Sequence, residues 1–528
     1  MLRFISACLL GLALLPSAAA QEISAPQYGD AKAAEAGASP LEEIRGAPVP
    51  CEDGMADAYA CLNVELLSFL PVDAIGGTAL NDIWGWTDPE TRREYALVGR
   101  RNGVAFVDVT DPIDPVFLGS LPATPGTPST TWRDVKVYGH HAFVVADNAG
   151  DHGVQVFDLR RLRDVVQPPS TFSEAARYDG IGSAHNIVVN EASGFAYAVA
   201  STGGACGPGL HMIDVNDPLH PVFAGCFSAT GTGRHGSGYT HDAQCVLYDG
   251  PDDDYAGREV CLAANETALN IVDVTHKDHP RDVARAAYPG VHYAHQGWLT
   301  EDHRYFLMDD ELDEVNADTA TATTRTRTIV WDVMDLDDPQ VVSLHEGTTT
   351  SIDHNQYVAG DRVYQANYTS GLRVLDVSDP TDPKEIAFFD TYPADDSIRF
   401  AGAWSVYPYF ESGSVIVSSI NEGLFVLRPA ASPDPPFDPP AAFRLLPAFP
   451  NPFDLQANIT LEIDRPQHVR VDLYDLHGRH VAVLFSAYVP EPGRRTIVLD
   501  ARRLASGAYI VRARGEGAAR TTTITVQK

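Results

Sequence analysis

Residues 103–109 read GVAFVDV, and the chain returns to this phrase six more times. The later copies are GVQVFDL (153–159), GLHMIDV (209–215), ALNIVDV (268–274), RTIVWDV (327–333), GLRVLDV (371–377) and GLFVLRP (423–429). In the first six copies, each aspartate follows the previous one by 44 to 59 residues. A period of roughly 40 to 50 residues made of short strands is typical of propeller blades. The sequence therefore predicts an all-β fold with a seven-bladed β-propeller.

Each repeat divides into four predicted strands, and the sixth repeat shows this most clearly. Its strands are expected at residues 354–360, 362–368, 371–377 and 383–393. The last repeat lacks a fourth strand, whereas NVELLSFLP (63–71) resembles the fourth strand of the first repeat. We predict that residues 63–71 pair with residues 423–428, because closing the ring in this way removes two exposed sheet edges.

Other segments flank the repeats. Residues 1–20 combine Arg3, an apolar run and an Ala18-x-Ala20 site, which indicates a secretory signal peptide. Residues 21–50 have the composition of a disordered leader, and the propeller is expected over 51–430. A proline-rich linker (431–441) then leads to residues 442–528, whose alternating strands and glycine turns predict an immunoglobulin-like β-sandwich.

Charge and cysteine content restrict the partners and the compartment. The net charge of −33 argues against nucleic acid and anionic membrane surfaces as partners. No stretch after Gln21 is apolar for long enough to be a transmembrane segment. Beyond the signal peptide an even number of cysteines favours disulfides between sequence neighbours, which would join Cys51 with Cys61, Cys206 with Cys226, and Cys245 with Cys261. A zinc site is the weaker interpretation, because no CxxC spacing occurs.

Several long strings resemble a known family. YTHDAQCVLYDG, YAHQGWLTEDHRYFLMDDELDE and RVYQANYTSGLRVLDVSDP are similar to the choice-of-anchor B proteins, which are built on LVIVD-type propeller repeats. The resemblance covers about residues 51–430 and implies an exported propeller joined to a surface-anchoring tail. It implies no particular reaction.

The tail has a resemblance of its own. PNPF, DLHGRHV and LASGAYIVR occur in the order found in type IX secretion sorting domains. This implies that the type IX secretion machinery recognises residues 442–528, and that the propeller is released or attached to surface lipopolysaccharide. An ordinary carbohydrate-binding or spacer sandwich is the alternative.

Polar residues recur where the first strand of each repeat begins, and in a propeller these strands line the central axis. Histidine stands there in four repeats, and the neighbouring positions carry short polar side chains. The histidines are His185, His241, His295 and His354; the polar residues, which could bind a ligand, are Asp82, Asp134, Asn186, Asp242, Gln296 and Asn355. Carboxylates at the ends of the second strands, Glu266 and Glu311 among them, should meet the histidines at one mouth of the ring.

Two interpretations of this polar ring stay open. The side chains could hydrogen-bond neighbouring blades, as buried polar groups must. Alternatively, the imidazoles could bind one divalent metal, such as zinc, manganese, iron or calcium. His241, His295 and His354 would then be the first ligands, with His185 next and Glu266 as a general base. The acidic stretch 308–318 could also hold calcium, although it lacks the spacing of an EF-hand loop.

Two functions from different classes fit these observations. One is an exported binding or interaction module, extracellular or on the outer cell surface, that recognises a glycan, a peptide or a protein. The alternative is a metal-dependent hydrolase or lyase whose site lies at the polar ring. No GxSxG, HExxH or P-loop string occurs, so the sequence favours the binding module over an enzyme.

Overall fold

The computed structural model describes residues 41–316, 325–430, 443–445, 451–463, 466–475, 480–515 and 518–528. The predicted signal peptide (1–20) and the predicted linker (431–441) lie outside these residues. The described part of the chain is built almost wholly of β-strands, as the sequence predicts.

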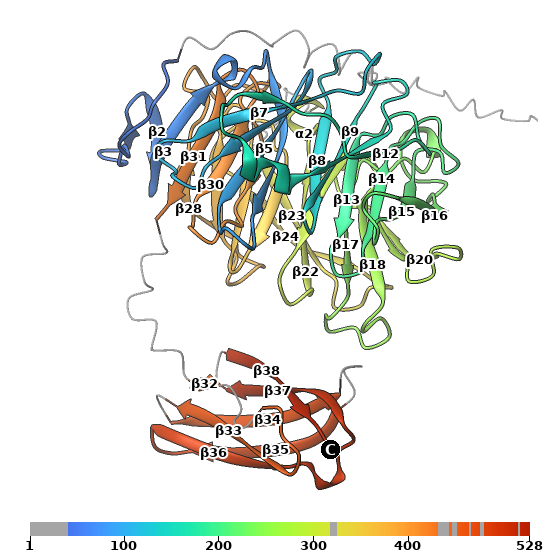
Figure 1. The fold of residues 1–528 in the computed structure, drawn as a ribbon, viewed down its shortest axis with the longest axis vertical. Helices are drawn as coiled ribbons and strands as arrows, with labels where there is room; N and C mark the ends of the chain where they lie inside the picture. Colours follow the sequence, from blue (N-terminus) through green and yellow to red (C-terminus); the bar gives the residue numbers. More distant parts are fainter. Residues whose placement is uncertain are drawn as a thin grey trace, which may run out of the picture.

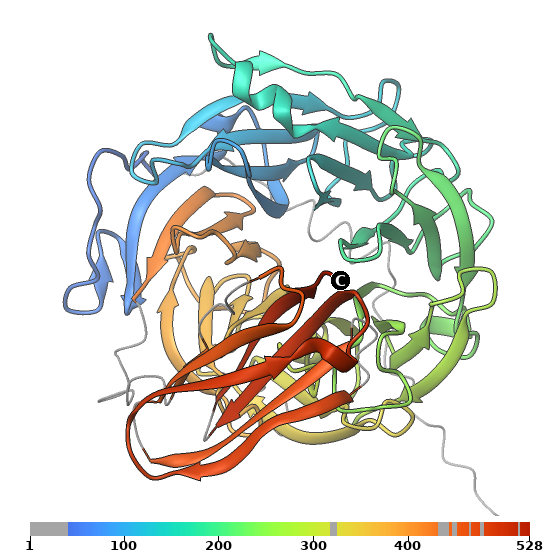
Figure 2. The same cartoon turned by 60° about the horizontal axis from the view of Figure 1, so that its bottom comes forward.

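Seven small sheets, mostly antiparallel, form a ring in residues 55–429 (Figure 2). Six of them begin at the ring axis and run outward in chain order. These are β4 (Leu80–Thr87), β5 (Glu94–Arg100), β6 (Gly103–Asp108) and β7 (Val116–Pro122); β8 (Arg133–Tyr138), β9 (His141–Ala146), β10 (Val154–Asp158) and β12 (Ala176–Tyr178); β13 (Asn186–Asn190), β14 (Phe195–Val199), β15 (Leu210–Asp214) and β16 (Val222–Phe227); β17 (Asp242–Leu247), β18 (Glu259–Ala264), β19 (Leu269–Asp273) and β20 (Arg281–Ala286); β21 (Ala294–Leu299), β22 (Tyr305–Asp310), β23 (Arg327–Asp332) and β24 (Gln340–Glu346); and β25 (Gln356–Ala359), β26 (Arg362–Ala366), β27 (Leu372–Asp376) and β28 (Lys384–Phe389).

The seventh sheet joins the two ends of the repeat region. It contains β29 (Ala403–Tyr407), β30 (Val415–Ser419), β31 (Gly423–Pro429) and, at its outer edge, β3 (Val64–Pro71). Strand β3 pairs antiparallel with β31 from Val64 opposite Pro429 to Pro71 opposite Gly423, so the predicted closure is confirmed. The inner strands β4, β8, β13, β17, β21, β25 and β29 each contact the next, and β29 contacts β4, which completes the circle.

The repeated phrase forms the third strand of every sheet, and its aspartate has a local role. In the first six copies the carboxylate accepts a hydrogen bond from the backbone N–H two residues later, at 2.8 to 3.1 Å. This Asx turn directs the chain away from the third strand. In the seventh copy Arg428 takes the place of the aspartate, and there the strand runs on to Pro429.

The core lies between neighbouring sheets, because the apolar residues of the repeated phrase are buried on both faces of each strand. The rings of Phe106 and Phe157, from the third strands of the first and second sheets, stack with centroids 4.5 Å apart. Leu97 and Val144 belong to the same cluster. Similar clusters fill the other junctions, so each sheet is stabilised by the one on either side.

The chain before β3 is bound to the ring. Ile44 and Val49 form backbone bridges with Phe69 and Leu66 of β3. Farther along, β1 (Met55–Ala56) and β2 (Tyr59–Leu62) extend the sixth sheet through pairing of β2 with β28. Backbone hydrogen bonds thus tie Ile44 and Val49 to β3, although residues 21–50 are predicted to form a disordered leader.

All three predicted disulfides are present. They join Cys51 to Cys61, Cys206 to Cys226, and Cys245 to Cys261. The third bond crosses between β17 and β18 at directly opposed residues. The pairing of sequence neighbours is thus confirmed, and cysteine ligation of zinc by these residues is excluded.

The C-terminal part folds into two sheets with a core of their own. One sheet contains β32 (Phe443–Leu445), β33 (Gln456–Ile463) and β36 (Gly493–Asp500); the other contains β34 (Gln467–Asp475), β35 (His480–Val489), β37 (Gly507–Gly515) and β38 (Ala518–Val526). Figure 1 shows them as two layers. Ile459 and Leu461 from one sheet and Val471, Val511 and Ile524 from the other form the buried core between them.

The closing strand should contribute strongly to stability. We expect Phe69→Ala to lower the free energy of unfolding by about 3–5 kcal/mol, because Phe69 is fully buried and its ring lies 4.5 Å from that of Phe425. The control is Leu62→Ala, at a side chain that is 42% exposed, which should change stability little. Deletion of residues 51–71 should abolish cooperative unfolding. Thermal unfolding followed by circular dichroism measures all three, and equal midpoints for Phe69→Ala and the parent chain would contradict the role of β3.

Candidate functional site

A row of four imidazoles runs along one end of the inner strands. The ring of His241 lies 4.3 Å from that of His185 on one side and 4.3 Å from that of His295 on the other, and His354 continues the row 4.5 Å beyond His295. Each histidine comes from a different sheet, at or just before its first strand. His241, His295 and His354 are buried. The predicted convergence of the four histidines is therefore present in the structure.

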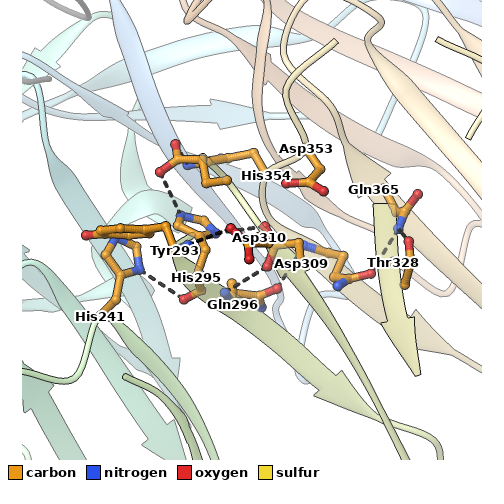
Figure 3. A network of polar contacts seen from close by, with 12 residues as sticks. His241, Tyr293, His295, Gln296, Asp309, Asp310, Thr328, Asp353, His354 and Gln365 are labelled. Atoms are coloured by element: carbon orange, nitrogen blue, oxygen red, sulfur yellow. Dashed lines mark hydrogen bonds and ion pairs between the residues drawn. The ribbon is translucent and has the colours of Figure 1, made fainter. Parts of the chain in front are cut away.

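Each imidazole uses Nδ1 to hold its position. Nδ1 of His241 lies 3.0 Å from the carbonyl oxygen of His295, and Nδ1 of His354 contacts the carbonyl of Trp404. Nδ1 of His295 lies 2.8 Å from Asp309, and Nδ1 of His185 lies 3.0 Å from Asp147 (Figure 3 shows the His241 and His295 contacts). A carbonyl oxygen can only accept, so His241 and His354 carry the Nδ1 proton.

Glu311 lies opposite the other ring nitrogen of two histidines. Its carboxylate is 3.4 Å from Nε2 of His354 and 3.7 Å from Nε2 of His295, and it also accepts a hydrogen bond from the Tyr368 hydroxyl at 2.6 Å. Because Nδ1 of His354 is a donor, its Nε2 is a lone pair in the neutral ring and faces a carboxylate. A proton or a cation between them relieves this repulsion.

This trio has the donor set of a metal centre. One ligand atom each from His295, Glu311 and His354 lie within 4.8 Å of one another. The Nδ1 contacts supply the second hydrogen bond that metal-binding imidazoles make, to a carboxylate or a carbonyl. Nitrogen and oxygen ligands in this combination suit zinc, manganese or iron.

Three of the residues predicted for the metal site do not belong to this trio. The carboxylate of Glu266 instead accepts a hydrogen bond from the backbone N–H of Arg234 at 2.5 Å, and the Arg234 side chain lies 4.0 Å away. Glu311 takes the position expected for it. His185 and His241 stand in the row but outside the trio. Burial, with His295 and His185 beside it, lowers the pKa of His241 well below its usual value, which keeps this ring neutral.

Three of the six predicted ligand-binding residues hydrogen-bond to the neighbouring sheet. The carboxylate of Asp134 accepts a hydrogen bond from the backbone N–H of Ile187 at 2.7 Å, and the amide oxygen of Gln296 accepts one from Gln356 at 3.0 Å (Figure 3 shows Gln296). Asn186 donates to the carbonyl of His241 at 3.5 Å. These bonds favour the structural interpretation for this part of the polar ring, since each joins the inner strands of neighbouring sheets.

The other three predicted ligand-binding residues are Asp82, Asp242 and Asn355. Asp82 and Asp134 both contact the ammonium of Lys136, at 3.3 and 2.5 Å, and Asn355 and Asp242 are largely removed from solvent. Burial opposes the charge on Lys136, but Asp134 and Asp82 raise its pKa well above the usual value. Burial also raises the pKa of Asp242 to about 6.

A pocket of about 290 Å³ opens among the inner strands. Indole rings of Trp84 and Trp298 line it together with Tyr357, whose ring they meet edge-on at 5.5 and 4.9 Å. Lys136 and Gln244 add polar groups, and the Lys136 ammonium lies 4.8 Å from the Trp84 ring. The pocket thus combines aromatic rings with the ammonium of Lys136, the carboxyl of Asp242 and the amide of Gln244.

The sequence contained a signal for this pocket that was missed. Each predicted ring residue has a partner two positions later that lines the pocket, because side chains at i and i+2 point to the same side of a strand. The pairs are Asp82 with Trp84, Asp134 with Lys136, Asn186 with Val188, Asp242 with Gln244, Gln296 with Trp298, and Asn355 with Tyr357.

Comparisons with known proteins identify two parts of the chain. Residues 355–391, which form the sixth sheet, match the model of the LVIVD repeat. Residues 447–527 match that of the secretion system C-terminal sorting domain. The chain carries an LVIVD repeat and a sorting domain. The sorting domain indicates passage through the type IX secretion system to the cell surface or the extracellular space. No curated protein matches the chain.

Solved structures resemble the chain only distantly. A protein from Lactobacillus plantarum is 12% identical over 79% of this chain and 99% of its own, with a TM-score of 0.41. A functionally unknown protein from Desulfotomaculum acetoxidans is 9% identical over 64% and 97%, with a TM-score of 0.40. A fungal alcohol oxidase in complex with copper is 10% identical over 85% and 97%, with a TM-score of 0.41. Similarity at this level says nothing about what the chain binds. Among the described residues no helix has the length and hydropathy needed to cross a membrane.

A buried acid near the closing sheet should make stability depend on pH. Burial raises the pKa of Glu422 to about 7, although its carboxylate accepts a hydrogen bond from Ser419 at 2.6 Å. The folded state therefore holds this proton more tightly than the unfolded state, and stability falls as pH rises from about 4.5 to about 7. We expect Glu422→Gln to exceed the parent chain in stability by up to about 3 kcal/mol at pH 8 and to equal it near pH 4.

Chemical denaturation at both pH values measures this difference. The control is Glu411→Gln, whose carboxylate forms an exposed ion pair with Arg92. If Glu422→Gln and the parent chain differ in stability by the same amount at pH 4 and at pH 8, then ionisation of Glu422 does not destabilise the folded protein.

Proposed function

We propose that the chain is an exported binding module of the choice-of-anchor B type, with a seven-bladed β-propeller over residues 51–430 and an immunoglobulin-like sorting domain over residues 442–528. The ring of seven sheets and the LVIVD match support the propeller. The two-layer tail and its sorting-domain match support delivery to the cell surface, where the propeller is attached or released. The metal-dependent hydrolase or lyase has no such support, and Glu266, its proposed general base, is held by Arg234.

The pocket lined by Trp84 and Trp298 is the observation that carries this proposal. Its volume of about 290 Å³ suits one or two rings of a small polar ligand. It lies on strands fixed by bonds between sheets, so its side chains are positioned before a ligand arrives.

Its chemistry favours a sugar unit. A pyranose presents an apolar C–H face that packs on an indole ring, and hydroxyls that hydrogen-bond to amide, carboxyl and ammonium groups. Gln244, Asp242 and Lys136 supply those three groups at the pocket wall. A glycan of the cell surface is therefore the ligand class that we propose for the module.

Sugar binding is testable by isothermal titration calorimetry with a panel of hexoses and N-acetylhexosamines. We expect at least one to bind, and Trp298→Ala to weaken it by about tenfold or more, since truncating a tryptophan at the centre of a binding site commonly costs about 2 kcal/mol or more. Val166→Ala, at an 89% exposed side chain, is the control. Failure of every sugar to bind, or equal affinity in Trp298→Ala, would contradict the assignment of the pocket.

The row of histidines supports a second role, as a metal centre within the same module. His295, Glu311 and His354 bring two imidazole nitrogens and a carboxylate together, with the Glu311 carboxylate 3.4 Å from Nε2 of His354. A zinc ion would satisfy all three groups. Such an ion would link β21, the connection after β22 and the segment before β25, which belong to two neighbouring sheets.

Zinc content separates this role from a purely structural one. After EDTA treatment and equilibration with zinc sulfate, we expect about one bound ion per chain, lost in His354→Gln and Glu311→Gln. His220→Gln, at a side chain that is 79% exposed, should keep it. Inductively coupled plasma mass spectrometry gives the stoichiometry. Equal zinc content in the parent chain and in the three variants would show that the histidines serve only as hydrogen-bonding groups of the fold.

A further inference from the structure

A second group of carboxylates lies between the fifth and sixth sheets, apart from the histidine trio. Asp313 and Glu314 belong to the short helix α2 (Asp313–Asn316), which follows β22, and Asp353 lies just before β25. One oxygen from each lies within 4.8 Å of the others, and all three side chains are buried. Figure 3 shows Asp353 in the same close-up as Asp309 and Asp310.

Two other buried acids nearby, Asp310 and Asp309, accept hydrogen bonds from N–H and O–H groups of the protein. Asp310 accepts hydrogen bonds from the Tyr288 hydroxyl and from the backbone N–H groups of His292 and Tyr293, at 2.5 to 2.8 Å. Asp309 accepts one from the backbone N–H of Gln296 at 2.7 Å. The chain therefore satisfies buried carboxylates in this region where it supplies N–H and O–H groups for them.

Glu314 has no such donor. Glu314 is 2% exposed, and neither of its carboxylate oxygens accepts a hydrogen bond from an N–H or O–H group in the described part of the chain. The same holds for one oxygen of Asp313 and one of Asp353. Four carboxylate oxygens of these three residues thus lack a donor, although buried polar atoms in proteins are nearly always satisfied.

The positive charge nearby does not balance these acids. Arg327 places its guanidinium 2.9 Å from Asp313 and 3.6 Å from Asp310, and its side chain also donates to the carbonyl of Gly290. Burial and the neighbouring carboxylates raise the pKa of Glu314 well above the usual range. The cluster therefore holds either shared protons or a cation.

We propose that Asp313, Glu314 and Asp353 bind a calcium ion that clamps the fifth sheet to the sixth. Every available ligand is a carboxylate oxygen, which suits a hard cation and disfavours zinc or copper. Export brings the protein to surroundings where calcium is plentiful, and extracellular modules bind it with dissociation constants of about 10⁻⁴ to 10⁻³ M. The ion supplies both the missing charge and the missing partner of Glu314.

Calcium-dependent stability of the full chain tests this assignment. After EDTA treatment and dialysis at pH 7.5, we expect 5 mM calcium chloride to raise the melting temperature by about 2 °C or more, because the ion binds only the folded state. Glu314→Gln and Asp353→Asn keep the side-chain size and remove one charge. We expect each to melt higher than the parent chain without calcium and to lose the calcium response. This pair of opposite effects separates a cation site from simple loss of packing.

Two control variants exclude binding elsewhere. Asp278→Asn removes a carboxylate that is 76% exposed, and Asp335→Asn disrupts the surface group of Asp252, Asp335 and Asp337. Both should keep the full response. Absence of a shift in the parent chain, its persistence in Glu314→Gln and Asp353→Asn, or its loss in Asp335→Asn would overturn the proposal. A larger shift with magnesium chloride at equal concentration would overturn the assignment to calcium.

Discussion

The pairing of β3 with β31 is the constraint on which the ring depends. In the other six sheets the first four strands counted from the axis come from one repeat, whereas this sheet takes its fourth strand from a segment more than 300 residues earlier; the ion pair of Glu65 with Arg428 spans 363 positions. Without it, two sheet edges would be exposed, and the first and last sheets would have no fixed spacing. With it, the inner strands stand in a closed circle, so that side chains from distant parts of the chain share one small volume.

Within that circle the same kinds of side chain serve two purposes. Asp134, Gln296 and the Nδ1 atoms of His241 and His354 hydrogen-bond to the backbone of neighbouring sheets, and these bonds make the inner wall rigid. This wall holds in place the groups proposed to bind ligands. They are the side chains of Trp84 and Trp298 and the imidazole Nε2 atoms that face Glu311. The structural and the chemical interpretation of the polar ring are therefore compatible, because they involve different side chains or, in His354, different nitrogens of one imidazole.

Much of this could be predicted from the repeated phrase. The aspartate of each copy forms an Asx turn with the residue two positions later, and such a local bond leaves a clear mark in the sequence. The disulfides and the closing strand followed from spacing and similarity. Which carboxylate faces the histidines was harder to predict, because Glu266 and Glu311 both follow a second strand. Only the fold determines that Glu266 is bonded to Arg234 whereas Glu311 faces two histidines. The bridges of Ile44 and Val49 with β3 likewise depend on tertiary contacts that composition does not reveal.

The position of β31 has a consequence for how the molecule is made. Its last residue, Pro429, precedes the sorting domain at 447–527, so all the strands of the ring are synthesised before the export signal that follows them. In a chain made from its N-terminus, β3 has no partner strand until β31 has been synthesised. The ring can therefore close only when nearly all of residues 64–429 is available.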